Sequence, residues 1–153
     1  MNAAYFHIVL VHIPIVLCPL GVILLVLAHY RHSMQIAQIA LGVVFAASIV
    51  SIPVFLLGEP AEEIVEHIAG ISENTIEQHE EAAEVALWIT LAAGALSLIT
   101  WICISVGSSL ERACLALTFF VASASSLALA YAGHKGGAIR HPEAFSRTEQ
   151  RTE

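Results

Sequence analysis

The stretch AAYFHIVLVHIPIVLCPLGVILLVLA, residues 3–28, decides the fold class, and only His7 and His12 interrupt its apolar sequence. An α-helix rises about 1.5 Å per residue, so roughly 20 apolar residues cross a hydrocarbon core about 30 Å thick. Further apolar runs of sufficient length cover residues 36–57, 82–106 and 113–132. We therefore expect an all-α membrane protein, built as a bundle of four transmembrane helices.

Composition supports this fold class and excludes several others. Of the 153 residues, 58% are hydrophobic and 12% are charged, against about 45–50% and about 25% in ordinary soluble domains. A single domain of this size has too little interior for so much apolar surface, which excludes a soluble enzyme. The net charge of −7 argues against a nucleic-acid partner. The three cysteines show no C-x-x-C spacing, which argues against a scaffold of disulfides.

A short helix is expected between the second and third spans. Pro60 suits the first position of a helix and Gly70 the position after its end, which predicts a helix from Pro60 to Ala69. Its apolar residues share one face while its glutamates point elsewhere, so we expect it to lie on the membrane surface.

Capping signals mark the starts of the last two spans. Asn74 with Glu77, and Ser108 with Glu111, have the spacing of a capping box. We expect the fourth span to be broken by three glycines, namely Gly133, Gly136 and Gly137. Residues 142–153 form a polar tail, so the transmembrane domain is expected to cover residues 1–141.

Four spans place both termini and the loop of residues 59–81 on one side of the membrane. The positive charges in this chain favour a cytoplasmic position for that side. Six of the eight histidines belong to it: His7, His12, His67, His79, His134 and His141. Residue counts back to the opposite turns put His12 at a similar depth to His134, and His7 at a similar depth to His79.

Histidines within apolar sequence are candidate ligands, because an imidazole in lipid needs a partner. Two histidines facing each other across a bundle can bind a b-type haem, whose propionates could pair with Lys135 and Arg140. We therefore expect a haem-binding electron-transfer protein with His12 and His134, or His7 and His79, as axial pairs. One alternative is a non-haem metal, held by His7 and His79 with Glu80 and nearby glutamates, or by the same four histidines. The other is a structural or assembly subunit of a larger complex, in which histidines only form hydrogen bonds with neighbouring helices.

Acidic residues are concentrated in one segment, since nine of the thirteen glutamates lie between Glu59 and Glu84. Such a segment is either a solvated surface or a docking site for a basic partner, such as a c-type cytochrome. Small residues also recur every four positions in the last span, at Ala122, Ser126 and Ala130. They predict close helix packing, within the chain or with another subunit of an oligomer or redox complex.

Two motifs resemble those of a bacterial four-helix membrane family catalogued as a domain of unknown function. The first is residues 6–14, FHIVLVHIP, and the second is residues 133–141, GHKGGAIRH, in which a glycine pair leads to His141. Pro142 stands where that family usually has glycine. Relatives occur fused to Rieske or c-type cytochrome modules. The resemblance therefore implies redox work in a bacterial inner membrane, with the histidine cluster on the exported side and His7, His12, His79, His134 and His141 as site residues.

Overall fold

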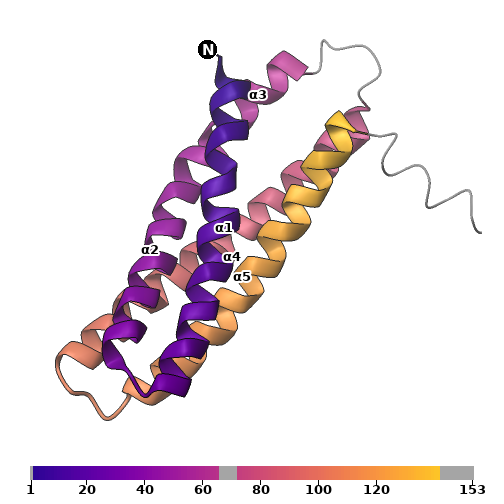
Figure 1. Ribbon diagram of the computed structural model, residues 1–153. Coiled ribbons are helices and arrows are strands. Elements are labelled where there is room, and N and C mark those ends of the chain that lie inside the picture. Colours follow the sequence, from indigo (N-terminus) through magenta and orange to yellow (C-terminus); the bar gives the residue numbers. More distant parts are fainter. Residues whose placement is uncertain (1, 66–71, 142–153) are drawn as a thin grey trace, which may run out of the picture.

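The computed structural model describes residues 2–65 and 72–141, and every regular element in these ranges is an α-helix. Figure 1 shows the elements in their arrangement. In chain order they are α1 (Ala3–Arg31), α2 (Met34–Leu56), α3 (Gly58–Val65), α4 (Glu73–Ser105) and α5 (Glu111–Arg140).

The four long helices form an antiparallel bundle. Each packs against its neighbours in the cyclic order α1, α2, α4, α5, so α1 and α4 lie across the bundle from each other. The start of α1, the short helix α3, the start of α4 and the end of α5 lie at one end of the bundle (Figure 1). All four long helices have the length and composition of membrane spans. The protein is thus a multi-pass membrane protein, and the expected four-helix bundle is confirmed.

Local signals explain most helix ends. Asn2 caps α1 by accepting the Tyr5 amide at 3.0 Å, and Ser33 caps α2 by accepting the Ile36 amide at 3.3 Å. Helix α5 begins at Glu111, and Leu110, not the predicted Ser108, stands at its N-cap position. The start of α4 differs from prediction, because Ser72 and not Asn74 stands at its N-cap position.

The short helix begins earlier than predicted, at Gly58, with only Leu57 between it and the end of α2, and it packs against α1. Its described part ends at Val65, so the rest of the predicted range, residues 66–69, lies outside the described residues. The predicted polar tail, residues 142–153, also lies outside them.

The predicted glycine break in the last span is wrong. Helix α5 runs without interruption through Gly133 and Gly136 to Arg140. Glycine weakens a helix interior by only about 1 kcal/mol, which packing can offset. A β-carbon on either glycine would press against another helix, on Ile15 or on His79, so these positions mark close helix approach.

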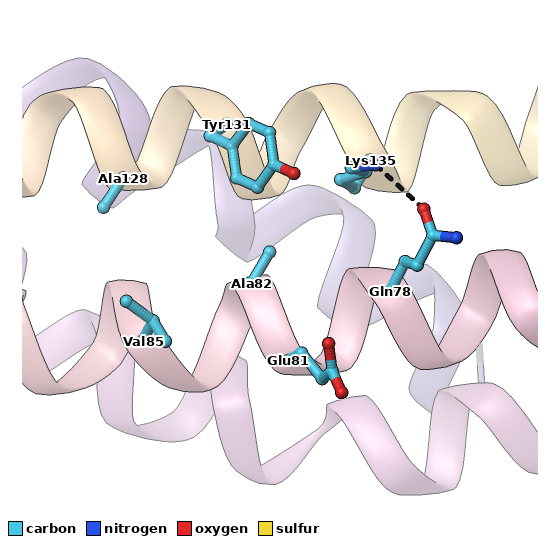
Figure 2. Close-up of a pocket in the computed structure, with 7 residues that line it drawn as sticks. All are labelled: Gln78, Glu81, Ala82, Val85, Ala128, Tyr131 and Lys135. Carbon is cyan, nitrogen blue, oxygen red and sulfur yellow. Dashed lines mark hydrogen bonds between the residues drawn. The ribbon is translucent and has the colours of Figure 1, made fainter.

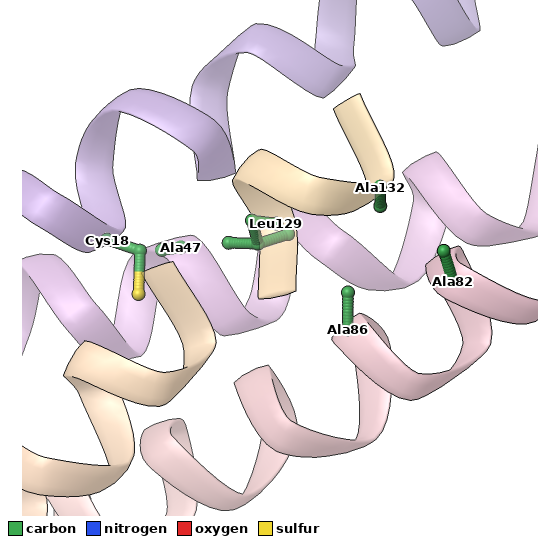
Figure 3. Packing of buried hydrophobic residues seen from close by; sticks show 6 residues of the cluster. All are labelled: Cys18, Ala47, Ala82, Ala86, Leu129 and Ala132. Atoms are coloured by element: carbon green, nitrogen blue, oxygen red, sulfur yellow. The ribbon is translucent and has the colours of Figure 1, made fainter. Parts of the chain in front are cut away.

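Small side chains let the helices approach closely along the bundle. Figure 3 shows one cluster of the core, in which four alanines pack with Cys18 and Leu129. A β-carbon added at Gly94 would overlap Ser48 on α2, and one added at Gly21 would overlap Val44. Such contacts are typical of membrane bundles, where packing and interhelical hydrogen bonds replace the hydrophobic effect.

Buried hydroxyl groups add polar links between helices. Thr90 and Ser125 join α4 to α5 at 2.6 Å, and Thr100 and Thr118 join the same helices at 2.8 Å. Within the described residues, no buried side-chain nitrogen or oxygen lacks a hydrogen-bond partner. These links fix the register of α4 against α5.

Candidate functional site

His7 of α1 and His79 of α4 meet at the end of the bundle that holds the start of α1 and the end of α5. Their ring centroids are 6.4 Å apart and their ring planes are perpendicular. Both side chains are half-buried. This is one of the two predicted histidine pairs, and its members make a ring contact across the bundle.

Each of these imidazoles forms a hydrogen bond to the backbone of the next long helix. The Nδ1 of His7 lies 2.9 Å from the Val54 carbonyl oxygen of α2, and the Nδ1 of His79 lies 3.0 Å from the Ala132 carbonyl oxygen of α5. A carbonyl oxygen only accepts, so both Nδ1 atoms carry the proton. In a neutral imidazole this leaves the lone pair of Nε2 as the free acceptor. The backbone therefore selects the tautomer of both histidines.

The two carbonyl acceptors become available in different ways. Val54 lies in the last turn of α2, where carbonyl groups lack a full set of partners inside the helix. Ala132 lies inside α5, so His79 must approach the side of an intact helix. Gly136, one turn further on, makes this approach feasible, because a β-carbon there would lie 3.0 Å from Cε1 of His79 and 3.3 Å from its Nδ1.

The other predicted pair lies elsewhere on the bundle. His12 is exposed on the outside of α1, and its Nδ1 lies 2.6 Å from the Ile8 carbonyl of the same helix. His134 is exposed on α5. Both residues are thus on the outer surface of the bundle.

Two further predicted site residues, Arg140 and His141, lie at the end of α5. Arg140 is the last residue of α5, and its side chain lies outside the described part of the structure. His141 directly follows α5, is exposed, and donates its backbone N–H to the Gly137 carbonyl. His67 lies outside the described residues.

A second pair of imidazoles at the opposite end of α1 provides a comparison. His29 and His32 have ring centroids 6.5 Å apart, but they are three residues apart at the end of one helix and both are exposed. The contact between His7 and His79 instead joins two helices from inside the bundle.

The number of ligands limits which groups the site could hold. Within residues 2–65 and 72–141, no three or more His, Cys, Asp or Glu side chains gather closely enough to hold a metal ion. His7 and His79 therefore offer two protein ligands. This number suits an iron ion whose other positions a porphyrin fills.

A groove of about 380 Å³ opens outward between α4 and α5 near this end of the bundle (Figure 2). At its mouth the Lys135 ammonium donates to the Gln78 side-chain oxygen at 2.9 Å and lies 5.5 Å from the centre of the Tyr131 ring. Val85 and Ala128 continue the groove as an apolar surface. Lys135 thus forms its hydrogen bond on the outer face of the α4–α5 pair.

The same end of the protein carries a concentration of carboxylates. The segments α3 and the first turns of α4 expose seven glutamates, which are Glu59, Glu63, Glu73, Glu77, Glu80, Glu81 and Glu84. Together they give an acidic surface, hereafter the acidic end, beside the two histidines. Its negative potential would attract a basic partner.

Comparisons of the chain with protein-family models, with curated proteins and with solved structures found no match. The family resemblance of residues 6–14 and 133–141 stays a prediction.

Proposed function

We propose that the protein is a membrane-integral electron-transfer protein that binds b-type haem, with His7 and His79 as its axial ligands. The observation that carries this proposal is the pair of Nδ1 hydrogen bonds to backbone carbonyls of α2 and α5. Metal-binding histidines almost always donate their other ring N–H to a carbonyl or carboxylate, which fixes the tautomer and the ring orientation. Both histidines have this arrangement.

The spacing of the rings supports the same assignment. Two imidazoles that would hold one metal ion between them, through nitrogen–metal bonds of about 2 Å, would have ring centroids about 6 Å apart. The observed separation is 6.4 Å. The two rings are also perpendicular to each other.

The ligand count favours haem over the non-haem alternative. A structural zinc site takes four protein ligands and a catalytic one three, more than the two histidines that meet here. A haem iron already has four nitrogens from its porphyrin and needs only axial ligands from the protein.

Bound haem would supply one-electron chemistry, and two axial histidines leave no open position for oxygen chemistry. In this chain, His7 and His79 would hold the group, and the Val54 and Ala132 carbonyls would keep the lone pairs of both Nε2 atoms available. Arg140 would pair with the propionates. Other predicted ligands, His12, His134 and His141, would have no axial role.

The proposed partner is a basic electron carrier, of which a c-type cytochrome is the model. The acidic end lies beside the two histidines, so a docked cationic protein would be near the redox group. The protein would work in the bacterial inner membrane with this end on the exported side, alone or as a subunit of a redox complex.

The decisive experiment replaces each histidine with asparagine and measures haem bound per protein. The side-chain amide of asparagine can donate a hydrogen bond as Nδ1 does, yet it offers no equivalent of Nε2. We expect purified protein to show sharp bands of reduced low-spin haem, and His7→Asn and His79→Asn each to lose them. His29→Asn and His32→Asn are the matched controls and should retain them. A protein without such bands that also fails to retain added haem would contradict the proposal.

A second candidate is a structural subunit of a larger membrane complex. It is favoured by the same hydrogen bonds, since His7 joins α1 to α2 and His79 joins α4 to α5. In that case the asparagine variants, which keep the donor, would fold and assemble as the unmodified protein does, and none of them would change a spectrum.

A further inference from the structure

Two cysteines face each other at the end of the bundle opposite the histidine pair. Cys103 lies two residues before the end of α4 and Cys114 three residues after the start of α5. Their sulfur atoms are 3.9 Å apart, in a thiol–thiol contact across the short α4–α5 turn. Both thiols are reduced and half-buried.

The register of the two helices holds these thiols together. One turn deeper in the bundle, the Thr100 and Thr118 hydroxyls meet at 2.8 Å. Thr100 stands three residues before Cys103, and Thr118 four residues after Cys114. Because residues three or four apart lie on the same face of a helix, the hydroxyl contact brings the two cysteine side chains to the same side. The approach of the sulfurs is therefore a consequence of helix packing.

We propose that Cys103 and Cys114 form a redox-active dithiol, which soluble disulfides oxidise to an internal disulfide that joins α4 to α5. One thiol loses its proton and attacks a sulfur of the external disulfide, which gives a mixed disulfide and releases one thiol. The second thiolate of the pair then attacks the mixed disulfide and releases the second thiol. The protein loses two electrons and two protons, and the external disulfide gains them as two thiols.

The closing step needs little movement. A disulfide bond is about 2.04 Å long, so the two sulfurs must approach by about 1.9 Å. Both cysteines lie within a turn of their helix ends, so the reagent reaches them from the aqueous side. Cys18 is different, since it is completely buried in the middle of the bundle and donates to Ser125 and to the Ala122 carbonyl. The dithiol is independent of the proposed haem site.

The test treats the purified 153-residue chain, in detergent or lipid discs, with oxidised glutathione. It measures the intact mass of the chain and its reaction with a maleimide. We expect the chain to lose two hydrogen atoms, with Cys103 and Cys114 protected from maleimide by a bond that a reducing agent breaks. The Cys18→Ala variant should behave in the same way. In Cys103→Ser the reaction should stop at the first step, with one glutathione attached to Cys114.

Three results would overturn the proposal. The first is that the chain without substitutions keeps its mass after the treatment. The second is that this chain ends with glutathione on both cysteines, because the pair then does not close to a disulfide. The third is a covalent dimer as the main product, because the thiols then react between chains.

Discussion

Replacing Gly136 with alanine tests the geometry of the histidine pair most directly. The new β-carbon would lie 3.0 Å from Cε1 of His79 and 3.3 Å from its Nδ1. Both separations are shorter than ordinary van der Waals contact, so the imidazole must move away from α5. Its hydrogen bond to the Ala132 carbonyl, 3.0 Å long, would then lengthen or break.

The expected free-energy change has two opposing parts. Alanine favours a helix interior over glycine by about 0.5–1 kcal/mol. Loss of the hydrogen bond costs about 0.5–1.5 kcal/mol, or up to about 3 kcal/mol if the buried donor finds no other partner. Gly133→Ala is the matched control, because it has the same helix gain and its β-carbon meets only the flexible end of Ile15, at 3.3 Å. Gly136→Ala should therefore be less stable than Gly133→Ala by about 0.5–3 kcal/mol.

The assay is reversible unfolding in mixed micelles with increasing sodium dodecyl sulfate, followed by circular dichroism of the helices. The same two variants are then loaded with haem, and Gly136→Ala should retain less of it than Gly133→Ala. Equal stabilities would refute the reasoning, since they would mean that His79 does not depend on its contact with α5. Unequal stabilities with equal haem retention would support the contact but remove His79 from the proposed ligands.

Three further predictions concern the bundle itself. Gly94→Ala should destabilise the protein by about 1–3 kcal/mol, because its methyl group overlaps Ser48, and Ser48→Gly in the same chain should restore most of the loss. Thr118→Val should lower the stability by about 0.6–1.7 kcal/mol, because the Thr100 hydroxyl loses its partner. Ser125→Ala should cost less, because the Thr90 hydroxyl that faces Ser125 keeps its hydrogen bond to the Ala86 carbonyl. Unfolding in mixed micelles measures both variants, and a larger loss for Ser125→Ala would be evidence against this account. Single cysteines placed at the start of α1 and at the end of α5 should react with an impermeant reagent added on one side of the membrane. Cysteines placed in the α1–α2 and α4–α5 turns should react with it on the other side. Labelling of the start of α1 and the end of α5 from opposite sides would contradict the topology.

The membrane fold could be predicted from the sequence because span length and apolar composition are one-dimensional properties. The runs at residues 3–28 and 113–132 fall within α1 and α5, and the runs at residues 36–57 and 82–106 extend past the ends of α2 and α4 by one residue each. The end of α5 could not be predicted in this way. Its glycines have poor intrinsic helix propensity, and only the contacts with Ile15 and His79 show why they belong inside a helix.

Depth along a helix could be counted from the sequence, whereas rotation about its axis could not. His7 and His12 are five residues apart, which places them about 140° apart around a helix of 3.6 residues per turn. Only one of them can face the interior, and the choice is not visible in a helix that is apolar on every side. The structure selects His7, and His12 faces outward. The depth count alone could not distinguish these two faces.

The spacing of small residues in α5 contains the missing information. Ala132 and Gly136 are four residues apart, a pattern of small residues that marks close approach of another helix. His134 lies two residues from each, so it points about 160° away from each of them, on the opposite side of the helix. If another helix approaches α5 closely at Ala132 and Gly136, a side chain of that helix must pack against this face. His134 must then face outward. His79 provides the packing side chain, and its hydrogen bond forms because α5 continues unbroken through its glycines.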